Sequence, residues 1–233
     1  MLKLLKQYST KAELVYNAIF DAIIENKLTP GSRLIVKEIA EQLSVSDIPV
    51  REALKMLEAT GLIVTKPYAG SVVATPSPEW IEEIFVMRAA LESMATRTSI
   101  PFLKSTDIQE IIAIDNQMKE EKGNPIEYAR LNREFHKAVM VKSPYPQLLA
   151  TINDLLVKSQ YGQAIFGLKP TTVKTSDLEH DELIEAIQQG DIDRADRLTR
   201  DHRLRVGSEL ADAMRKIVIT KNSTVEGENE KNV

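Results

Sequence analysis

The sequence predicts a mostly α-helical protein, in which a small N-terminal unit with one β-hairpin precedes an antiparallel all-helical bundle. Three observations lead to this fold class. Ala, Ile, Leu, Glu and Lys dominate the 233 residues and aromatic residues make up only 5%, a composition that favours helices. Apolar residues recur at helical spacing over most of the chain. The exceptions are two short β-rich runs at residues 62–65 and 71–74.

The first 75 residues predict three helices and then the hairpin. A helix over residues 10–27 ends before the Pro30-Gly31 turn, and a short one is expected at 36–43. Ser46 is a candidate N-cap for the third helix, which Gly61 ends. The apolar residues of that helix at i, i+4 and i+7 are Val50, Leu54 and Leu57. This order of elements is the layout of a winged helix-turn-helix.

The remainder predicts a bundle of antiparallel helices joined by short, Pro- and Gly-containing loops. The helices are expected near residues 78–97, 105–121, 124–142, 146–167, 171–189 and 191–216. The core of such a bundle is the usual place for a ligand site. The polar segment 219–233 is expected to be disordered. We therefore predict a winged domain at 1–75, a helical domain at 76–218 and a tail at 219–233.

Composition excludes some functions without selecting one. The absence of cysteine excludes disulfides, thiolate metal sites and a cysteine nucleophile. No apolar run approaches the roughly 18 residues that span a bilayer, and no signal-peptide pattern is seen, so a cytoplasmic protein without membrane contact is expected. The net charge is -4, so DNA binding depends on where basic groups are placed rather than on bulk charge.

The third helix presents a polar stripe on the face opposite its apolar one. Asp47, Arg51 and Lys55 recur every four residues. Exposed positions at the start of such a helix can reach bases or phosphates in the major groove. The same spacing also suits an ion-pair ladder on an ordinary surface, and periodicity alone does not separate these interpretations.

The amino-acid sequence around this stripe distinguishes the two interpretations better than its periodicity does. The segments PGSRL (30–34), EIAEQLSVS (38–46), PVREAL (49–54) and LEATGL (57–62) closely resemble the GntR family of bacterial transcription regulators. The resemblance implies binding to operator DNA as a homodimer. It assigns operator contacts to Ser46, Asp47, Ile48, Arg51 and Gly70, with Lys37 as a weaker candidate. Many relatives carry arginine at position 47. The carboxylate of Asp47 cannot bond to guanine as arginine does, but it can accept from cytosine or orient Arg51.

The chain has three histidines, His136, His180 and His202, one on each of three expected helices. Asn132 precedes His136 by four residues and shares its helix face. Three imidazoles that meet in a bundle core suit zinc, nickel or manganese. Alternatively, the three histidines are scattered surface or core groups.

A second resemblance bears on these histidines. FVMRAALE (85–92), NREFH (132–136), EH (179–180) with AI (186–187), and the span 190–202 look like the FCD effector domain of FadR-type GntR regulators. It implies a divalent-metal site at Asn132, His136, His180 and His202, although this family usually has Asp at the first position. The neutral amide leaves more positive charge at the metal and so favours an anionic ligand.

The resemblance also implies an effector. Related regulators sense small carboxylates, and Arg88 could pair with one, or it could form a structural ion pair with Glu92. We therefore expect a ligand-responsive transcription regulator rather than an enzyme. The alternative is a regulator for which the cation itself is the signal. Hydrolysis at a three-histidine metal site is disfavoured because Glu134, two residues before His136, and Glu179, one residue before His180, do not stand in an HExxH pattern.

Overall fold

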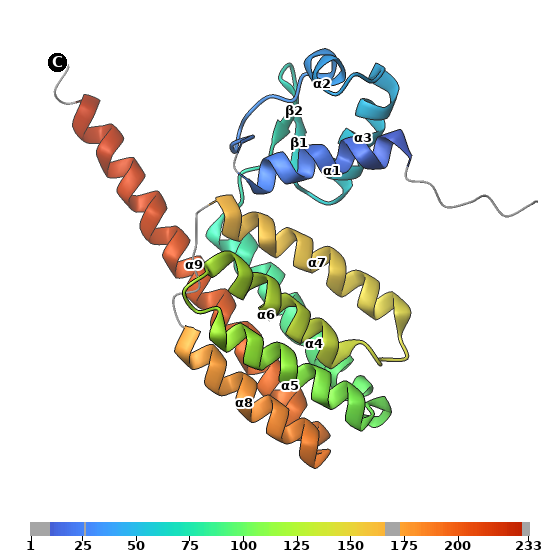
Figure 1. Ribbon diagram of the computed structural model, residues 1–233. Coiled ribbons are helices and arrows are strands. Elements are labelled where there is room, and N and C mark those ends of the chain that lie inside the picture. The colour runs from blue at the N-terminus through green and yellow to red at the C-terminus, as the bar shows by residue number, and fades with distance from the viewer. Residues whose placement is uncertain (1–9, 26, 166–172, 230–233) are drawn as a thin grey trace, which may run out of the picture. The chain divides into compact units, whose positions relative to one another are not determined.

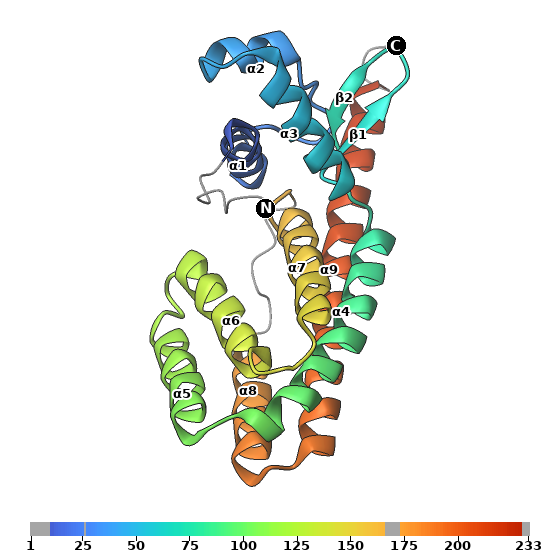
Figure 2. The same cartoon turned by 90° about the vertical axis from the view of Figure 1, so that its right-hand side faces the viewer.

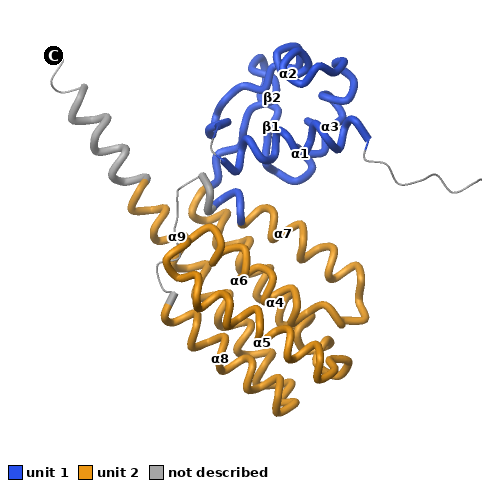
Figure 3. Tube along the Cα trace, viewed as in Figure 1, with its two compact units in different colours: residues 1–76, 160–165 blue, residues 77–159, 166–233 orange. Residues whose placement is uncertain are grey.

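Helices dominate the computed structural model (Figure 1), which describes residues 10–25, 27–165 and 173–229. The small hairpin of β1 and β2 is seen best in the turned view (Figure 2). Contacts divide the chain into two compact units, coloured separately in Figure 3. Unit 1 comprises residues 1–76 with 160–165, and unit 2 comprises 77–159 with 166–233. The predicted fold class is confirmed.

Unit 1 has three helices and a hairpin, in the order expected from the sequence. Its elements are α1 (Lys11–Ile24), α2 (Val36–Gln42), α3 (Asp47–Ala59), β1 (Ile63–Lys66) and β2 (Gly70–Val73). Thr10 and Glu13 form a capping box that fixes the start of α1. The apolar stripe of α3 is buried: Val50 and Leu57 are fully enclosed. Ser46 occupies the N-cap position of α3, but its side chain makes no capping hydrogen bond.

The hairpin forms a wing with a tight turn. Lys66 pairs with Gly70 at the end of the antiparallel ladder. Gly70 has φ 73° and Tyr68 has φ 64°, a left-handed conformation that glycine adopts readily and tyrosine rarely. Arg33 Nε donates a hydrogen bond to the Ala69 carbonyl at 3.0 Å. This bond ties the segment before α2 to the tip of the wing.

Unit 2 is the helical bundle. Its helices are α4 (Pro78–Ser99), α5 (Ser105–Glu120), α6 (Pro125–Met140), α7 (Pro146–Ile165), α8 (Val173–Gln189) and α9 (Ile192–Asn229), with a 3-10 turn at Ile100–Phe102. Residues 160–165, the end of α7, are grouped with unit 1. Ser77 caps α4 by accepting from the Trp80 amide. The helices start and end close to the predicted residues, except that α9 continues beyond 216 to Asn229. Residues 166–172 and 230–233, which include predicted helix ends and the end of the predicted tail, lie outside the described residues.

The helices α4 and α9 lie along each other in unit 2 (Figure 2). Ile81, Phe85, Leu210 and Met214 are buried between them. Gly207 of α9 faces Phe85, where a Cβ would come within 2.3 Å of the Phe85 Cβ. A second apolar cluster joins α5, α6, α8 and the start of α9 through residues such as Ile111, Phe135 and Leu183. The three histidines lie on helices that this cluster holds together.

Candidate functional site

The predicted DNA-contacting residues are on exposed parts of unit 1. Ser46, Ile48 and Arg51 are exposed at the start of α3, and Asp47 between them is half-buried. Lys37 is exposed on α2 and Gly70 on the wing. Ile48, with 68% of its surface exposed, is an apolar side chain that the core of unit 1 does not use. Such a side chain can contact a thymine methyl group.

The ion-pair ladder considered for α3 is only weakly formed. Arg51 Nη2 lies 3.9 Å from Asp47 Oδ2, and the two side chains are 65% and 46% exposed. This separation is too long for a hydrogen bond, and exposed pairs of this kind contribute little stability. The Arg51 guanidinium is therefore available to a partner outside the chain.

The three histidines converge in the core of unit 2. His136 on α6, His180 on α8 and His202 on α9 are 3%, 1% and 5% exposed. Their ring centroids are 5.0 to 5.1 Å apart, and one nitrogen from each lies within 4.8 Å of the others. Phe135 packs against the His180 ring and helps to fix it, with ring centroids 4.4 Å apart. The structure thus brings together residues that are 66 positions apart in the sequence.

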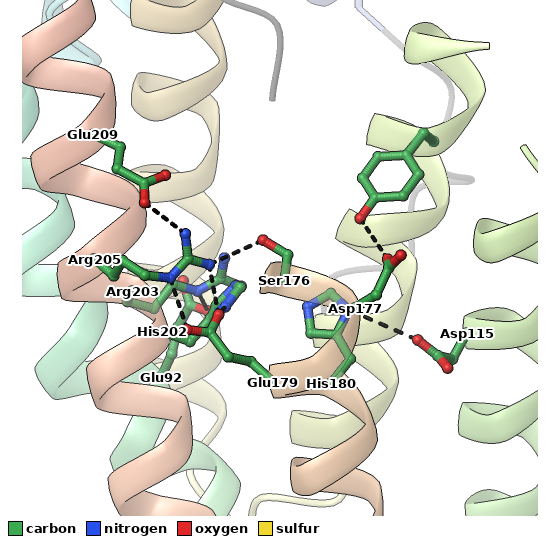
Figure 4. Close-up of polar contacts among 11 residues, drawn as sticks. Glu92, Asp115, Ser176, Asp177, Glu179, His180, His202, Arg203, Arg205 and Glu209 are labelled. Carbon is green, nitrogen blue, oxygen red and sulfur yellow. Dashed lines mark hydrogen bonds and ion pairs between the residues drawn. The ribbon is translucent and has the colours of Figure 1, made fainter. Parts of the chain in front are cut away.

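A carboxylate orients one of the rings. His202 Nδ1 lies 2.6 Å from Glu179 Oε2, and Glu179 in turn accepts hydrogen bonds from Arg205 (Figure 4). Burial would raise the pKa of Glu179, but the hydrogen bonds from His202 and Arg205 lower it to about 2. Because an ionised carboxylate only accepts, Nδ1 of His202 carries the proton and Nε2 keeps its lone pair. Metal-binding histidines are commonly held in this way.

The histidines are neutral at physiological pH. Burial lowers the pKa of His136 and His180 well below 6.5, and it lowers that of His202 to about 4. Among the described residues, His136 Nε2 and both ring nitrogens of His180 are buried without a hydrogen-bond partner. Buried polar atoms without partners are rare and call for an explanation. Three neutral imidazoles with free nitrogens in close proximity fit a divalent metal ion.

Two further residues belong to the surroundings of the histidines. Asn132 is half-buried on α6, one turn before His136. Asp115 on α5 has its Oδ1 atom 3.7 Å from His180 Nδ1, while its Oδ2 atom pairs with Lys119 at 2.7 Å. Asp115 Oδ1 has no hydrogen-bond partner in the described part of the chain. Sequence reasoning did not identify Asp115.

A buried network of two arginines and one glutamate joins α4 to α9. Glu92 accepts from Arg88 Nε at 2.7 Å and from Arg203 Nε at 2.6 Å, and Arg88 also donates to Ser159 at 3.0 Å. Glu92 is fully buried and both arginines are less than 5% exposed. Burial disfavours the charged form of Glu92, but its two arginine partners outweigh this and lower its pKa. The Arg88–Glu92 ion pair considered from the sequence is therefore present.

Two family models match this chain. One, described as bacterial regulatory proteins of the gntR family, matches residues 11–73, and the FCD domain model matches residues 83–205. The second match covers more than half of the chain. This protein belongs to the GntR family and carries an FCD domain. Its N-terminal unit is the winged DNA-binding domain of that family.

Curated relatives of this GntR protein are named as transcription regulators. HTH-type transcriptional regulator McbR of Escherichia coli is 33% identical over 133 residues, which are 56% of this chain and 60% of McbR. This match therefore spans less than two thirds of McbR. A probable D-xylose utilization operon transcriptional repressor of Paenarthrobacter nicotinovorans is 27% identical over 198 residues, 83% of this chain and 86% of that protein.

Solved structures show the same fold. The E. coli McbR/YncC structure superposes with a TM-score of 0.73 and 24% identity, covering 88% of this chain and 99% of that one. A GntR regulator from Rhodococcus sp. RHA1 gives a TM-score of 0.72 with 18% identity over the same shares of the chains. Among the described residues of this GntR protein, no helix has the length and apolar content that a membrane span requires.

Proposed function

We propose that this regulator binds operator DNA as a homodimer and that a small carboxylate, bound with a divalent metal at the histidine cluster, changes its affinity for DNA. The observation that supports the metal site is the meeting of three buried neutral histidines whose nitrogens lie within 4.8 Å of one another. His136, His180 and His202 supply the ring nitrogens, and Asn132 is the candidate for a further oxygen ligand. Zinc, nickel and manganese accept such ligands.

A bound divalent metal would supply positive charge and open coordination positions for a carboxylate. The surrounding residues keep the histidines in one protonation state and tautomer. Glu179 fixes the His202 tautomer, and burial keeps all three histidines neutral at physiological pH. The effector regulates DNA binding only if it binds one arrangement of the dimer better than another.

For DNA recognition, we propose that Ser46, Asp47, Ile48 and Arg51 face base edges in the major groove, with Lys37 near a phosphate and Gly70 at the minor groove. Two copies of α3 in successive major grooves would read a near-palindromic site. The exposure of the α3 N-terminus and the weak Arg51–Asp47 pair support this assignment.

The function is tested with a DNA fragment that the wild-type protein selects from a random library. Gel-shift titrations are run with zinc and a panel of hydroxy acids, sugar acids and dicarboxylates. His180→Ala should abolish the response to the active acid and leave unliganded DNA binding unchanged. Glu182→Ala, an exposed substitution on the same helix, should respond like wild type. Unchanged sensitivity of His180→Ala would overturn the proposed effector site.

The same titrations separate the carboxylate from the cation as signal. If zinc alone changes DNA affinity and no acid alters the result, the regulator responds to metal and the carboxylate part of the proposal is wrong. Native mass spectrometry of protein purified without chelator or affinity tag tests the dimer and its metal content directly.

A further inference from the structure

The Arg88–Glu92–Arg203 network carries one unbalanced positive charge inside the bundle. Among the described residues, Glu92 is the one carboxylate paired with both arginines, which are 4% and 3% exposed. An arginine guanidinium keeps its charge at neutral pH in proteins, so both arginines are positively charged. A buried charge without full compensation is costly.

Arg203 has a donor that the chain itself does not use. Glu92 holds Arg203 through Nε at 2.6 Å, while Arg203 Nη2 is buried with no hydrogen-bond partner among the described residues. Arg88, by contrast, already donates from Nε to Glu92 and from Nη1 to Ser159. The open donor for an anion is therefore on Arg203 rather than on the residue expected from the sequence.

Arg203 also acts on the histidine cluster. It directly follows His202 on α9, and the close-up shows the two side chains near each other beside Glu92 (Figure 4). Its positive charge repels a divalent cation held by these rings. The ring nitrogens and the Asn132 amide are neutral. The two carboxylates near the rings already have basic partners, since Glu179 is bonded to Arg205 and Asp115 to Lys119.

We propose that Arg203 anchors an anion beside the histidine cluster, so that a divalent cation and a small carboxylate bind there cooperatively, each weakly alone and tightly together. The carboxylate accepts a hydrogen bond from Arg203 Nη2 and balances both the guanidinium and the cation. Glu92 is the positioning residue, since its bond to Nε sets the direction of the guanidinium. The inference rests on the proposed function but adds a specific claim, that neither ligand is retained well without the other.

The wild-type protein tests this coupling without any mutation. Zinc affinity is measured by competition with a chromophoric chelator, in acetate and in chloride at equal ionic strength, with correction for the weak zinc–acetate complex. Acetate should raise zinc affinity about 5- to 150-fold, the usual range of coupling between two ligands. By linkage, zinc must raise acetate affinity by the same factor. Equal zinc affinity in acetate and chloride would overturn the proposal.

Variants of Arg203 test whether this residue causes the coupling between zinc and acetate. Arg203→Leu should bind zinc more tightly than wild type in chloride and lose the effect of acetate, whereas Arg203→Lys, which keeps the charge, should retain part of it. Arg200→Leu changes a more exposed arginine one turn earlier on α9 and should behave like wild type. If Arg203→Leu is folded but still shows the full acetate effect, Arg203 is not the anchor. If Arg203→Leu does not fold, the zinc–acetate linkage in wild type and Arg203→Lys decides.

The outcomes distinguish this inference from the proposed function. Tight zinc binding that is independent of acetate, together with effector-dependent DNA binding, would overturn the coupling and leave the regulator intact. Failure to bind zinc, nickel or manganese in either anion would overturn the metal site itself, and with it both the coupling and the effector part of the proposed function.

Discussion

Glu179 Oε2 lies 2.6 Å from His202 Nδ1 and thereby fixes which nitrogen of His202 faces the other two histidines. Glu179 stays ionised because its hydrogen bonds from His202 and Arg205 outweigh burial and lower its pKa to about 2. It is less than a quarter exposed, so its charge is only partly screened by water. Through this carboxylate, α8 orients the His202 ring of α9, which is a proposed metal ligand.

Glu179→Gln should therefore weaken metal binding. The neutral amide no longer stabilises the Nδ1–H group, and its two donors can hold the ring in the wrong orientation. Loss of such a supporting carboxylate typically reduces metal affinity about 10- to 100-fold. Zinc affinity is measured by chelator competition, and Glu182→Gln, an exposed change on the same helix, serves as the control. Equal affinities for the two variants would contradict the orienting role of Glu179.

The metal-free protein should lose stability as pH falls below about 6.5. Burial lowers the pKa of His202 to about 4, so between these values the unfolded chain binds a proton that the folded chain does not. The unfolding free energy then falls as pH falls, by about 3 kcal/mol for His202 over this range. Burial lowers the pKa of His136 and His180 too, so they act in the same direction.

Urea unfolding of the chelator-treated protein near pH 7 and near pH 5 measures this effect. In His202→Gln the dependence on pH should be shallower, because one of the three titrating groups is gone. A metal-free protein that is equally stable at both pH values would show that the histidines are protonated in the folded state.

Gly207→Ala should destabilise the bundle, although alanine is the better helix former. A Cβ at this position would lie 2.3 Å from Phe85 Cβ and 2.8 Å from Phe85 Cγ, and atoms this close to the backbone cannot rotate away. Overpacking of this kind costs about 1–3 kcal/mol, more than the roughly 1 kcal/mol gained in helix propensity. Gly123→Ala, where a Cβ meets nothing within 4 Å, is the matched control. Urea unfolding that finds Gly207→Ala more stable would refute the close approach of α4 and α9.

Most of the fold could be predicted because local signals agree with tertiary packing. Ser77 followed by Pro78 correctly predicts the start of α4, and the stripe of Val50, Leu54 and Leu57 correctly predicts the buried face of α3. The predicted end of α9 at residue 216 is too early, because the polar residues after 216 lack an apolar stripe. A helix already formed adds one hydrogen bond for each further residue, and α9 continues to Asn229.

The candidate site was less predictable. The family resemblance predicts that the three histidines meet, as they do in the structure, but Asp115 lies on a helix with no sequence link to them. The sequence does indicate that Arg203 is buried. It stands four residues after Thr199 and eight after Ala195, both buried on α9, so helical periodicity places its charge on the inner face. Glu92, which is 111 residues away in the sequence, determines which donor of Arg203 is paired. The unpaired donor can therefore be identified only in the folded chain.

Arg51→Ala should weaken binding to the selected DNA by about 1–3 kcal/mol and relax the preference at one base position. The Arg51 side chain is 65% exposed, and its pairing with Asp47 at 3.9 Å is too weak to hold it to the surface of α3. Fluorescence anisotropy on the selected site and on single-base variants measures both effects. Lys137→Ala removes the same charge from an exposed position on α6 and should leave affinity unchanged. If Arg51→Ala keeps wild-type affinity and base preference, the proposal that α3 contacts bases in the major groove through Arg51 is wrong.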